Sequence, residues 1–219
     1  FDLWADTENF DNVQFAIGAD RPSPLRYRGR TPFRTIAEVV GTVVTDTLWS
    51  FSGNRIGVVD YYAVQRGDQY QMQVHMREPD SANYRFRFMT TGSGMFDVWS
   101  SSTFGYSSMD AVAPNTTTLP SAVHYVLPDK DQHIVDSWAC SPNVLTVANY
   151  QNETSYIDYL GNPQSVGGRE DSIASPSSAG PARMGLMKPD IAAPGSIIFT
   201  GPSLVILQAS IANNGIAVD

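Results

Sequence analysis

An alternation of apolar and polar side chains in the first half of the chain limits the fold most strongly. In residues 70–76 the alternating residues are Tyr70, Gln71, Met72, Gln73, Val74, His75 and Met76. Residues 84–88 alternate in the same way. A period of two places every second side chain on the same face of an extended strand. Each segment is therefore predicted to be a strand with one buried face and one solvated face.

Short strand-like segments recur through residues 1–115 and are separated by turns rich in Gly, Asn and Asp. The further strands predicted here are Asn12–Ile17, Ala37–Val44, Arg55–Tyr62 and Met95–Ser100. The turn at Thr90–Gly94 predicts that the strands on either side of it form a hairpin. Evenly spaced short strands with such turns are typical of an antiparallel β-sandwich, and we expect one of jelly-roll type.

The alternation ends at Ala113–Pro120, a polar stretch bounded by prolines that is typical of a linker. The expected fold is mainly β, with a β-sandwich domain over residues 1–115 and a second, α/β-type domain over residues 116–219. In the second domain the apolar runs Asn143–Ala148 and Ile197–Phe199 predict strands that are buried on both faces of a parallel sheet.

Charge and hydropathy argue against nucleic-acid binding and against a membrane span. The 219-residue chain has 14 Lys and Arg against 22 Asp and Glu, a net charge of −8, whereas nucleic-acid binding requires clustered basic residues. Arg26, Arg28 and Arg30 form the densest basic group, and we expect them to decorate a loop. No stretch approaches the roughly 20 apolar residues that span a bilayer. We therefore expect no nucleic-acid partner and no membrane span.

Two motifs rich in glycine and proline stand near the C-terminal end. They are Ser177-Ser178-Ala179-Gly180-Pro181 and Lys188-Pro189-Asp190-Ile191-Ala192-Ala193-Pro194-Gly195. Gly180 permits a tight turn, and Pro181 fixes its own φ at about −65°. Pro189 biases the residue before it toward extended backbone. This turn chemistry predicts a scaffold, and none of these residues is expected to be catalytic.

The two motifs together read S-S-x-G-P-x-x-x-G-x-x-K-P-D-I-x-A-P-G, which closely resembles a block of the subtilisin-like serine proteases (subtilases). Ser141–Val147 also resembles the family strand a-P-x-V-I-T-V-G-A, which precedes that block. In the family, the block lies between the oxyanion-hole asparagine and the G-T-S-M-A motif that carries the nucleophilic serine. The family positions matched here are Ser177, Ser178, Gly180, Pro181, Lys188, Pro189, Asp190, Pro194 and Gly195.

The chain also departs from the family pattern. Pro176 stands where the family usually has Phe before the two serines, and Met184-Gly185-Leu186 replaces a triplet like Asp-Gly-Arg. The motif similarity is confined to the last third of the chain. Residues 1–115 resemble, more loosely, the β-sandwich inserts of some large bacterial subtilases, with Phe96–Ser101 as the part that fits best.

The resemblance implies a longer, extracytoplasmic parent protein that hydrolyses polypeptide substrates with a Ser-His-Asp triad. No G-T-S-M-A, H-G-T-H-V-A-G or Asp-Ser/Thr-Gly motif occurs in this chain. The histidines, His75, His124 and His133, stand in polar surroundings, and we expect solvated side chains. The triad is therefore expected outside the chain, which would be a non-catalytic fragment without peptidase activity of its own.

No cofactor is expected for this chain, and no metal-ligand motif is present. The alternative of a structural calcium ion stays open, because Glu170, Asp171 and Asp190 offer the oxygen ligands that hard cations prefer. The apolar strands Val144–Val147 and Ile197–Phe199 would lack covering segments in a fragment, so self-association is also expected.

Two other functions stay open at this stage. The sandwich is alternatively a carbohydrate- or protein-binding module of a secreted or cell-surface protein. In that case Trp99, Phe104 and Tyr106 form a platform for a sugar, although the same aromatic residues also suit the core and rim of a sandwich. In the third reading the parent has lost its triad and serves as a scaffold or adhesin.

Overall fold

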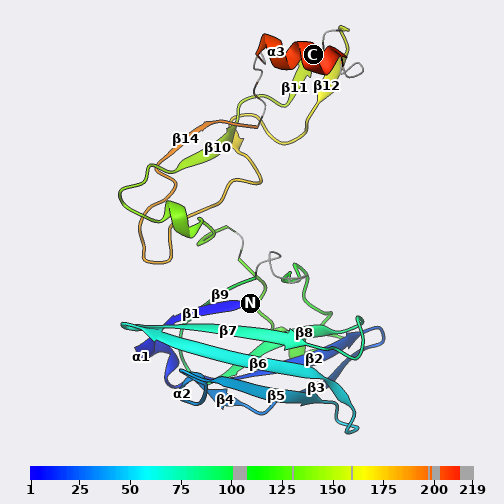
Figure 1. Cartoon of the computed structure of the whole chain (residues 1–219). Helices are drawn as coiled ribbons and strands as arrows, with labels where there is room; N and C mark the ends of the chain where they lie inside the picture. Colours follow the sequence, from blue (N-terminus) through cyan, green and yellow to red (C-terminus); the bar gives the residue numbers. More distant parts are fainter. Residues whose placement is uncertain (101–107, 130, 159, 197, 199–202, 213–219) are drawn as a thin grey trace. The chain divides into compact units, whose positions relative to one another are not determined.

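The computed structural model describes residues 1–100, 108–129, 131–158, 160–196, 198 and 203–212. The chain divides into two compact units, Phe1–Pro128 and Asp129–Asp219. The described part is mainly β, as predicted from the sequence, and most of its strands pair in antiparallel fashion (Figure 1).

The first unit contains a five-stranded antiparallel sheet. Its strands are β1 (Asp2–Asp6), β5 (Val43–Trp49), β6 (Arg55–Arg66), β7 (Gln69–Arg77) and β9 (Asp97–Trp99), in the order β5-β6-β7-β1-β9. Leu3 of β1 lies opposite Met72 of β7 and Val98 of β9. Along β7, Met72 and Val74 are buried and His75 is exposed. The predicted alternation of this strand is therefore confirmed.

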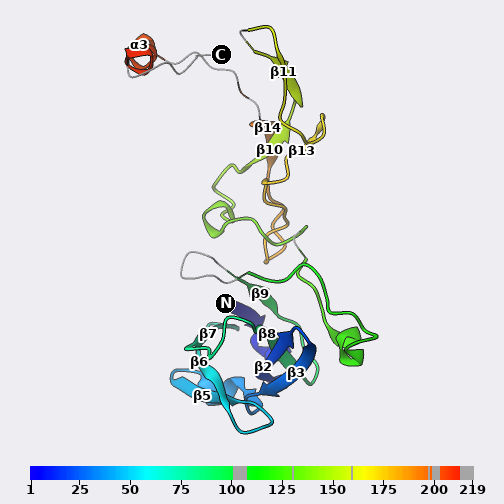
Figure 2. The same ribbon diagram turned by 90° about the vertical axis from the view of Figure 1, so that its right-hand side faces the viewer.

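A second antiparallel sheet is organised around its longest strand, β2. Its members are β2 (Gln14–Pro22), β3 (Leu25–Arg30), β4 (Arg34–Thr35) and β8 (Arg85–Thr91), and β2 pairs with each of the other three. Figure 2 shows β2, β3 and β8 on the opposite side of the unit from β5, β6 and β7. Two helical turns, α1 (Thr7–Phe10) and α2 (Ile36–Val39), precede strands β2 and β5.

The apolar side chains between the two sheets form one core. Phe15 of β2 is fully buried, and its ring centroid lies 5.5 Å from that of Tyr61 of β6. The same ring lies 6.0 Å from the rings of Phe10 and Phe88. Because the core takes side chains from both sheets, the unit is sandwich-like, and its stability depends on residues far apart in the sequence.

Two predicted elements of this unit are wrong. The strands on either side of Thr90–Gly94 do not form a hairpin, because β8 pairs with β2 and β9 pairs with β1 in the other sheet. A Cβ on Gly94 would overlap a backbone oxygen of α1, so the chain packs against that helical turn as it changes sheets. The predicted strand Ala37–Val44 is α2 followed by the start of β5. Thr35 and Glu38 form a capping box there, which favours a helical turn.

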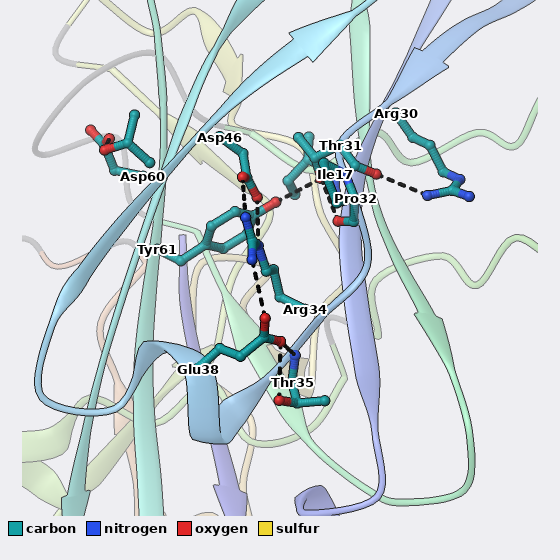
Figure 3. Close-up of polar contacts among 11 residues, drawn as sticks. Ile17, Arg30, Thr31, Pro32, Arg34, Thr35, Glu38, Asp46, Asp60 and Tyr61 are labelled. Carbon is teal, nitrogen blue, oxygen red and sulfur yellow. Dashed lines mark hydrogen bonds and ion pairs between the residues drawn. The ribbon is translucent and has the colours of Figure 1, made fainter.

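A buried pair of hydroxyl groups lies between the sheets (Figure 3). Thr31 and Tyr61 are both fully buried. The Thr31 Oγ1 accepts a hydrogen bond from the Ile17 backbone N–H at 3.0 Å and lies 3.0 Å from the Tyr61 hydroxyl oxygen. Burial raises the pKa of Tyr61 to about 12. The tyrosine is therefore neutral at pH 7, and both hydroxyl groups have a hydrogen-bond partner inside the core.

Arg34 ties β4 of one sheet to β5 of the other (Figure 3). Its Nε and Nη2 donate to the two carboxylate oxygens of Asp46 at 3.0 and 2.6 Å, and its Nη1 donates to Glu38 at 3.1 Å. The backbone N–H of Thr35, and after it Arg34, hold the pKa of Glu38 below its usual range. A bidentate pair of this kind fixes geometry as well as adding energy.

Replacing Thr31 by Val is expected to lower the free energy of unfolding of the first unit by about 1–3 kcal/mol. The substitution keeps the shape but leaves the Ile17 N–H and the Tyr61 hydroxyl without their buried partner. Thr45→Val is the matched control, because Thr45 is exposed and donates to Asp60 at 2.7 Å; it should change stability by no more than about 0.5 kcal/mol. Equal losses of unfolding free energy for the two variants, measured with urea, would show that the buried Thr31–Tyr61 pair stabilises the fold no more than an exposed threonine does.

A second polar cluster lies on the outward face of β2. Asp20 is 2% exposed, and its Oδ2 lies 2.8 Å from the Arg87 Nε and accepts a hydrogen bond from the Tyr125 hydroxyl at 2.9 Å. The Arg87 guanidinium carbon lies 4.5 Å from the ring centroid of Tyr27 and 5.1 Å from that of Tyr125. Burial raises the pKa of Asp20, and Arg87 offsets part of that rise.

The contact of Tyr125 explains where the first unit ends. The 3-10 helix η2 (Pro120–His124) buries Ala122, and Tyr125 follows it directly onto Asp20. The structure accordingly divides the chain after Pro128, whereas the boundary predicted from the sequence lies after residue 115. Residues 116–128 therefore belong to the first unit.

The second unit is made of short strands. Strand β10 (Val147–Gln151) pairs in parallel with β14 (Ile191–Pro194) and in antiparallel fashion with β13 (Ser172–Ile173). Strands β11 (Ser155–Ile157) and β12 (Pro163–Ser165) form a hairpin, and the described helices are the 3-10 helix η3 (Ser137–Ala139) and α3 (Leu204–Ala212). The predicted strand in Asn143–Ala148 begins only at Val147. Ile197 and Phe199 of the other predicted strand lie outside the described residues.

Candidate functional site

The parallel pairing of β10 with β14 places the second glycine- and proline-rich motif beside β10. Val147 lies opposite Ile191, and Tyr150 lies opposite Pro194. Parallel strands require a long crossover connection, and here that connection carries β11 to β13 and the first motif. Val147 is 50% exposed and Ile191 is 52% exposed. The self-association expected of such apolar strands stays a prediction.

Lys188 is buried, whereas the other matched positions are half-buried or exposed. Its Nζ donates to the Val144 carbonyl oxygen at 2.6 Å and to Asp190 Oδ2 at 2.7 Å. The same carboxylate oxygen accepts a hydrogen bond from the Thr146 backbone N–H at 2.7 Å. Lys188, followed by that N–H, holds the pKa of Asp190 below its usual range. These bonds fasten the segment before β10 to the start of β14.

The first motif contacts the same region of the second unit. The Ser177 Oγ accepts a hydrogen bond from the Asn149 backbone N–H at 2.9 Å, while Ser178 is exposed. A Cβ on Gly180 would overlap the carbonyl oxygen of Lys188 and lie 2.8 Å from its carbonyl carbon. Only glycine therefore lets the two motif backbones approach this closely. Pro181 follows at once, and the Gly180–Pro181 and Lys188–Pro189 peptide bonds are both cis.

The end of the second motif turns against β10. The Gly195 backbone N–H donates to the Tyr150 carbonyl oxygen at 3.1 Å, and a Cβ on Gly195 would lie 2.7 Å from Asn149 Oδ1. The Ser196 Oγ donates to the same amide oxygen at 3.4 Å. Asn149 therefore anchors both motifs, through its backbone and its side chain. Nothing in its sequence context distinguishes Asn149, so no sequence signal pointed to this role.

The assembled motif residues hold backbone geometry, and the buried Lys188 ammonium is engaged in doing so. Acyl transfer by a serine requires a base within hydrogen-bond reach and a carboxylate that orients the base. The Ser177 Oγ is bonded to a backbone N–H, and the Lys188 ammonium is bonded to a carbonyl and a carboxylate. His75 and His124 are exposed residues of the first unit, as expected, whereas His133 of the second unit is half-buried and its Nδ1 is buried, contrary to the solvated side chain expected of it. The contacts of Ser177 and Lys188 hold the backbones of the two motifs in place.

The carboxylates considered for a cation have separate partners. Asp190 is paired with Lys188, Asp171 accepts from the Tyr150 hydroxyl at 2.5 Å, and Glu170 accepts from Thr154 at 3.5 Å. In the part of the chain that the structure describes, no three His, Cys, Asp or Glu side chains group as metal ligands would. A structural calcium ion here stays a prediction.

The structure places the basic residues differently from the sequence prediction. Arg26, Arg28 and Arg30 lie on strand β3 and not on a loop. The alternation in Leu25–Arg30 is itself a strand signal, and it could have indicated this placement. Of the predicted sugar platform, Trp99 is half-buried at the end of β9, and Phe104 and Tyr106 lie outside the described residues.

No protein-family model, curated protein or solved structure matches this chain. Of the helices within the described ranges, none has the length and apolar character needed to cross a membrane. The function must therefore be inferred from the residues themselves and from the geometry that holds them.

Proposed function

We propose that this chain is a non-catalytic part of a subtilisin-like serine endopeptidase. Residues 129–219 would contribute framework to the catalytic domain, and residues 1–128 would form an inserted, jelly-roll-like sandwich. The parent protein would act outside the cytoplasm and hydrolyse polypeptides with a Ser-His-Asp triad from other segments. The chain by itself would have no peptidase activity.

The observation that supports this proposal most is the direct backbone contact between Gly180 and Lys188. The two motifs that resemble the family block are packed together. Ser177 joins the first motif to β10, and Asp190 joins the second motif to Thr146, directly before β10. The glycine and the lysine thus have a structural reason to occur at this spacing.

The position of the second motif favours the same proposal. In sheets with parallel strands, reacting groups gather at the carboxyl ends of the strands. Pro194 ends β14, and Gly195 leaves that strand beside Tyr150 near the carboxyl end of the parallel strand β10. A following segment that carried a nucleophile would therefore start at the carboxyl ends of these strands, where reacting groups gather.

A serine-directed fluorophosphonate tests the proposal. The full-length parent protein should be labelled and should cleave an unstructured protein such as casein, whereas the 219-residue chain should do neither. A parent variant with His75, His124 and His133 all replaced by Ala should keep its activity, because these histidines are assigned no role in the triad.

Three results would overturn the proposal. They are labelling of a serine within this chain, loss of activity in the triple histidine variant despite a folded protein, and a parent that neither labels nor cleaves. The last result would favour the scaffold or adhesin reading.

We also propose that the sandwich contributes binding and not chemistry, as in the alternative that the sequence left open. A specific observation favours this role. Among the described residues, Arg21, Arg26 and Arg28 form no ion pair, although they lie close together in a chain with a net charge of −8.

A further inference from the structure

The arginines of the first unit fall into two groups. Those with acidic partners form the pairs Arg34–Asp46, Arg55–Glu78, Arg77–Asp60, Arg85–Asp110 and Arg87–Asp20. In the described ranges, Arg21, Arg26, Arg28, Arg30 and Arg66 have no such partner. Arg30 donates to the Thr31 carbonyl oxygen and lies over the Phe33 ring, and Arg66 donates to Gln71, whereas no hydrogen bond or ring contact of this kind engages Arg21 or Arg26 within the described residues. Uncompensated cations that gather on an acidic protein attract an anion locally, although the net charge of the chain repels one.

Strand pairing gathers three of these arginines, Arg21, Arg26 and Arg28. Arg21 of β2 lies directly opposite Arg26 of β3, and like charges in that position destabilise a sheet. A bulge lies next to this pair, because Tyr27 is paired with Asp20 and Gly29 with Ala19. Arg28 is the extra residue of the bulge, and bulges re-aim side chains. Local conflicts of this kind are expected at functional sites.

Two hollows flank Arg28 and share it. One encloses about 220 Å³ and is lined by Arg21, Arg28, Ser81, Asn83 and Tyr84. The other encloses about 310 Å³ and is lined by Arg26, Tyr27, Arg28, Phe51 and Ser52. The described residues that line them include no carboxylate. Pockets for drug-sized ligands enclose about 300–1,000 Å³. One hollow lies below this range and the other at its lower end, so each suits one small unit of a longer ligand.

The described part of the protein does not satisfy all the polar groups of Arg28. The Arg28 Nε is buried and has no hydrogen-bond partner among the described residues. A guanidinium group binds carboxylates through parallel hydrogen bonds. The side chains of Ser52, Ser81 and Asn83 add groups that bind hydroxyls.

An exposed aromatic ring completes this surface. Phe51 is 74% exposed, and its ring lies edge-on to that of Tyr27 at a centroid distance of 5.1 Å. The Phe51 backbone N–H donates to the Arg28 carbonyl oxygen at 2.9 Å, which holds the loop on β3. A fixed, exposed aromatic face packs well against the C–H groups of a sugar ring, because the ring face is electron-rich.

An extended acidic peptide suits this surface less well. Peptides commonly bind by adding a strand to a free sheet edge. The edge of β3 is occupied at Arg28 by the Phe51 N–H. At Gly29 a Cβ would overlap the Trp49 carbonyl oxygen, so the backbones already touch there. A peptide would have to bind through its side chains alone.

We propose that this end of the sandwich binds an acidic polysaccharide. Consecutive carboxylate-bearing sugar units occupy the two hollows, Arg28 lies between their carboxylates, and Phe51 packs against one sugar ring. Arg21 and Arg26 each bind one carboxylate from the outer side. The inference rests on the binding role proposed for the sandwich and is independent of the protease assignment.

Calorimetric titration of the 219-residue chain with an oligogalacturonate tests this inference. Arg28→Gln should weaken binding at least about tenfold, because charge-assisted hydrogen bonds are lost. Arg66→Gln is the control for charge, since Arg66 is exposed on β6 and donates to Gln71 at 3.0 Å; it should leave Kd within about twofold. Phe51→Ala should weaken binding without any change of charge. Urea unfolding would establish that each variant is folded.

The inference is overturned if the oligogalacturonate does not bind or if folded Arg28→Gln binds as the unchanged chain does. Equal binding of a neutral cello-oligosaccharide, or tighter binding of polyglutamate, would also overturn it, and the latter would assign the surface to acidic proteins. Fluorophosphonate labelling of the parent is a separate measurement. Loss of sugar binding with retained labelling therefore refutes only this inference, and the reverse result refutes only the protease assignment.

Discussion

Replacing Arg87 by Met is expected to lower the free energy of unfolding of the first unit by about 3–5 kcal/mol at neutral pH, because it leaves a buried charge without its partner. The carboxylate is that of Asp20, which is 2% exposed. The Tyr125 hydroxyl would remain as a hydrogen-bond donor to Asp20, but it cannot neutralise the negative charge. Urea unfolding followed by fluorescence measures the loss.

The same strand supplies a control for this variant. The side chains of Arg85 and Asp110 are 62% and 53% exposed, and they pair at 3.0 Å. Exposed pairs contribute little, so Arg85→Met should cost no more than about 1 kcal/mol. A similar loss of unfolding free energy in both variants would show that the buried Asp20–Arg87 pair stabilises the fold no more than an exposed pair does.

The destabilisation of Arg87→Met should depend on pH in a defined direction. The pKa of Asp20 is raised by burial and partly lowered by Arg87, so removing Arg87 raises it further. A carboxyl whose folded-state pKa lies above the unfolded value of about 3.9 stabilises the fold below that value and loses this contribution as pH rises. The difference in free energy of unfolding between the variant and the unchanged chain should therefore shrink as pH falls through the Asp20 pKa of the variant. A difference that grew on acidification would contradict this assignment.

Replacing Gly180 by Ala is expected to destabilise the second unit by about 3 kcal/mol or more, because a Cβ overlaps backbone atoms that cannot move independently. The atoms concerned are the carbonyl group of Lys188, whose side chain is held by Val144 and Asp190. The expected result is faster amide exchange throughout β10 and β14 and loss of resistance to limited proteolysis after residue 128. The first unit should keep its unfolding midpoint.

Gly185 provides the matched control for Gly180. It lies between the same two motifs, has a φ of +79°, and an added Cβ there would meet nothing within 4 Å. Gly185→Ala should therefore cost only about 1 kcal/mol, the strain of a positive φ without a clash. Equal protection of β10 and β14 in the two variants would contradict the close approach of the two motifs.

The sequence predicted those strands whose conformation is decided by residues close to one another along the chain. The alternation around Met72 and Val74 predicted β7, and Arg55–Tyr62 predicted most of β6. The turn at Thr90–Gly94 was recognised, but the hairpin was not formed, because the choice of partner strand depends on packing across both sheets. The helical turn α2 was missed. Its capping box, Thr35 with Glu38, is a helix signal, but the β-branched residues that follow it favour a strand.

The candidate site shows the same division. Glycine and proline at positions 180, 181, 189 and 195 indicated tight scaffold turns from their backbone preferences alone. The sequence did not indicate that Lys188 would be buried, because burial of an ammonium group requires the Val144 carbonyl and the Asp190 carboxylate to meet it. It did not indicate the role of Asn149 either, nor that Arg21, Arg26 and Arg28 would lie together without an acidic partner among the described residues, because contacts between distant residues are set by the tertiary structure.

The sequence alone determined that this chain is mainly β and where its backbone must turn tightly, since alternation and glycine or proline stereochemistry act over a few residues. Only the tertiary structure decided which strands pair, where the first unit ends and which charges are compensated. These features depend on contacts between residues distant in sequence, such as Tyr125 with Asp20 and Thr146 with Asp190. Their free energies depend on burial, which a linear pattern does not specify.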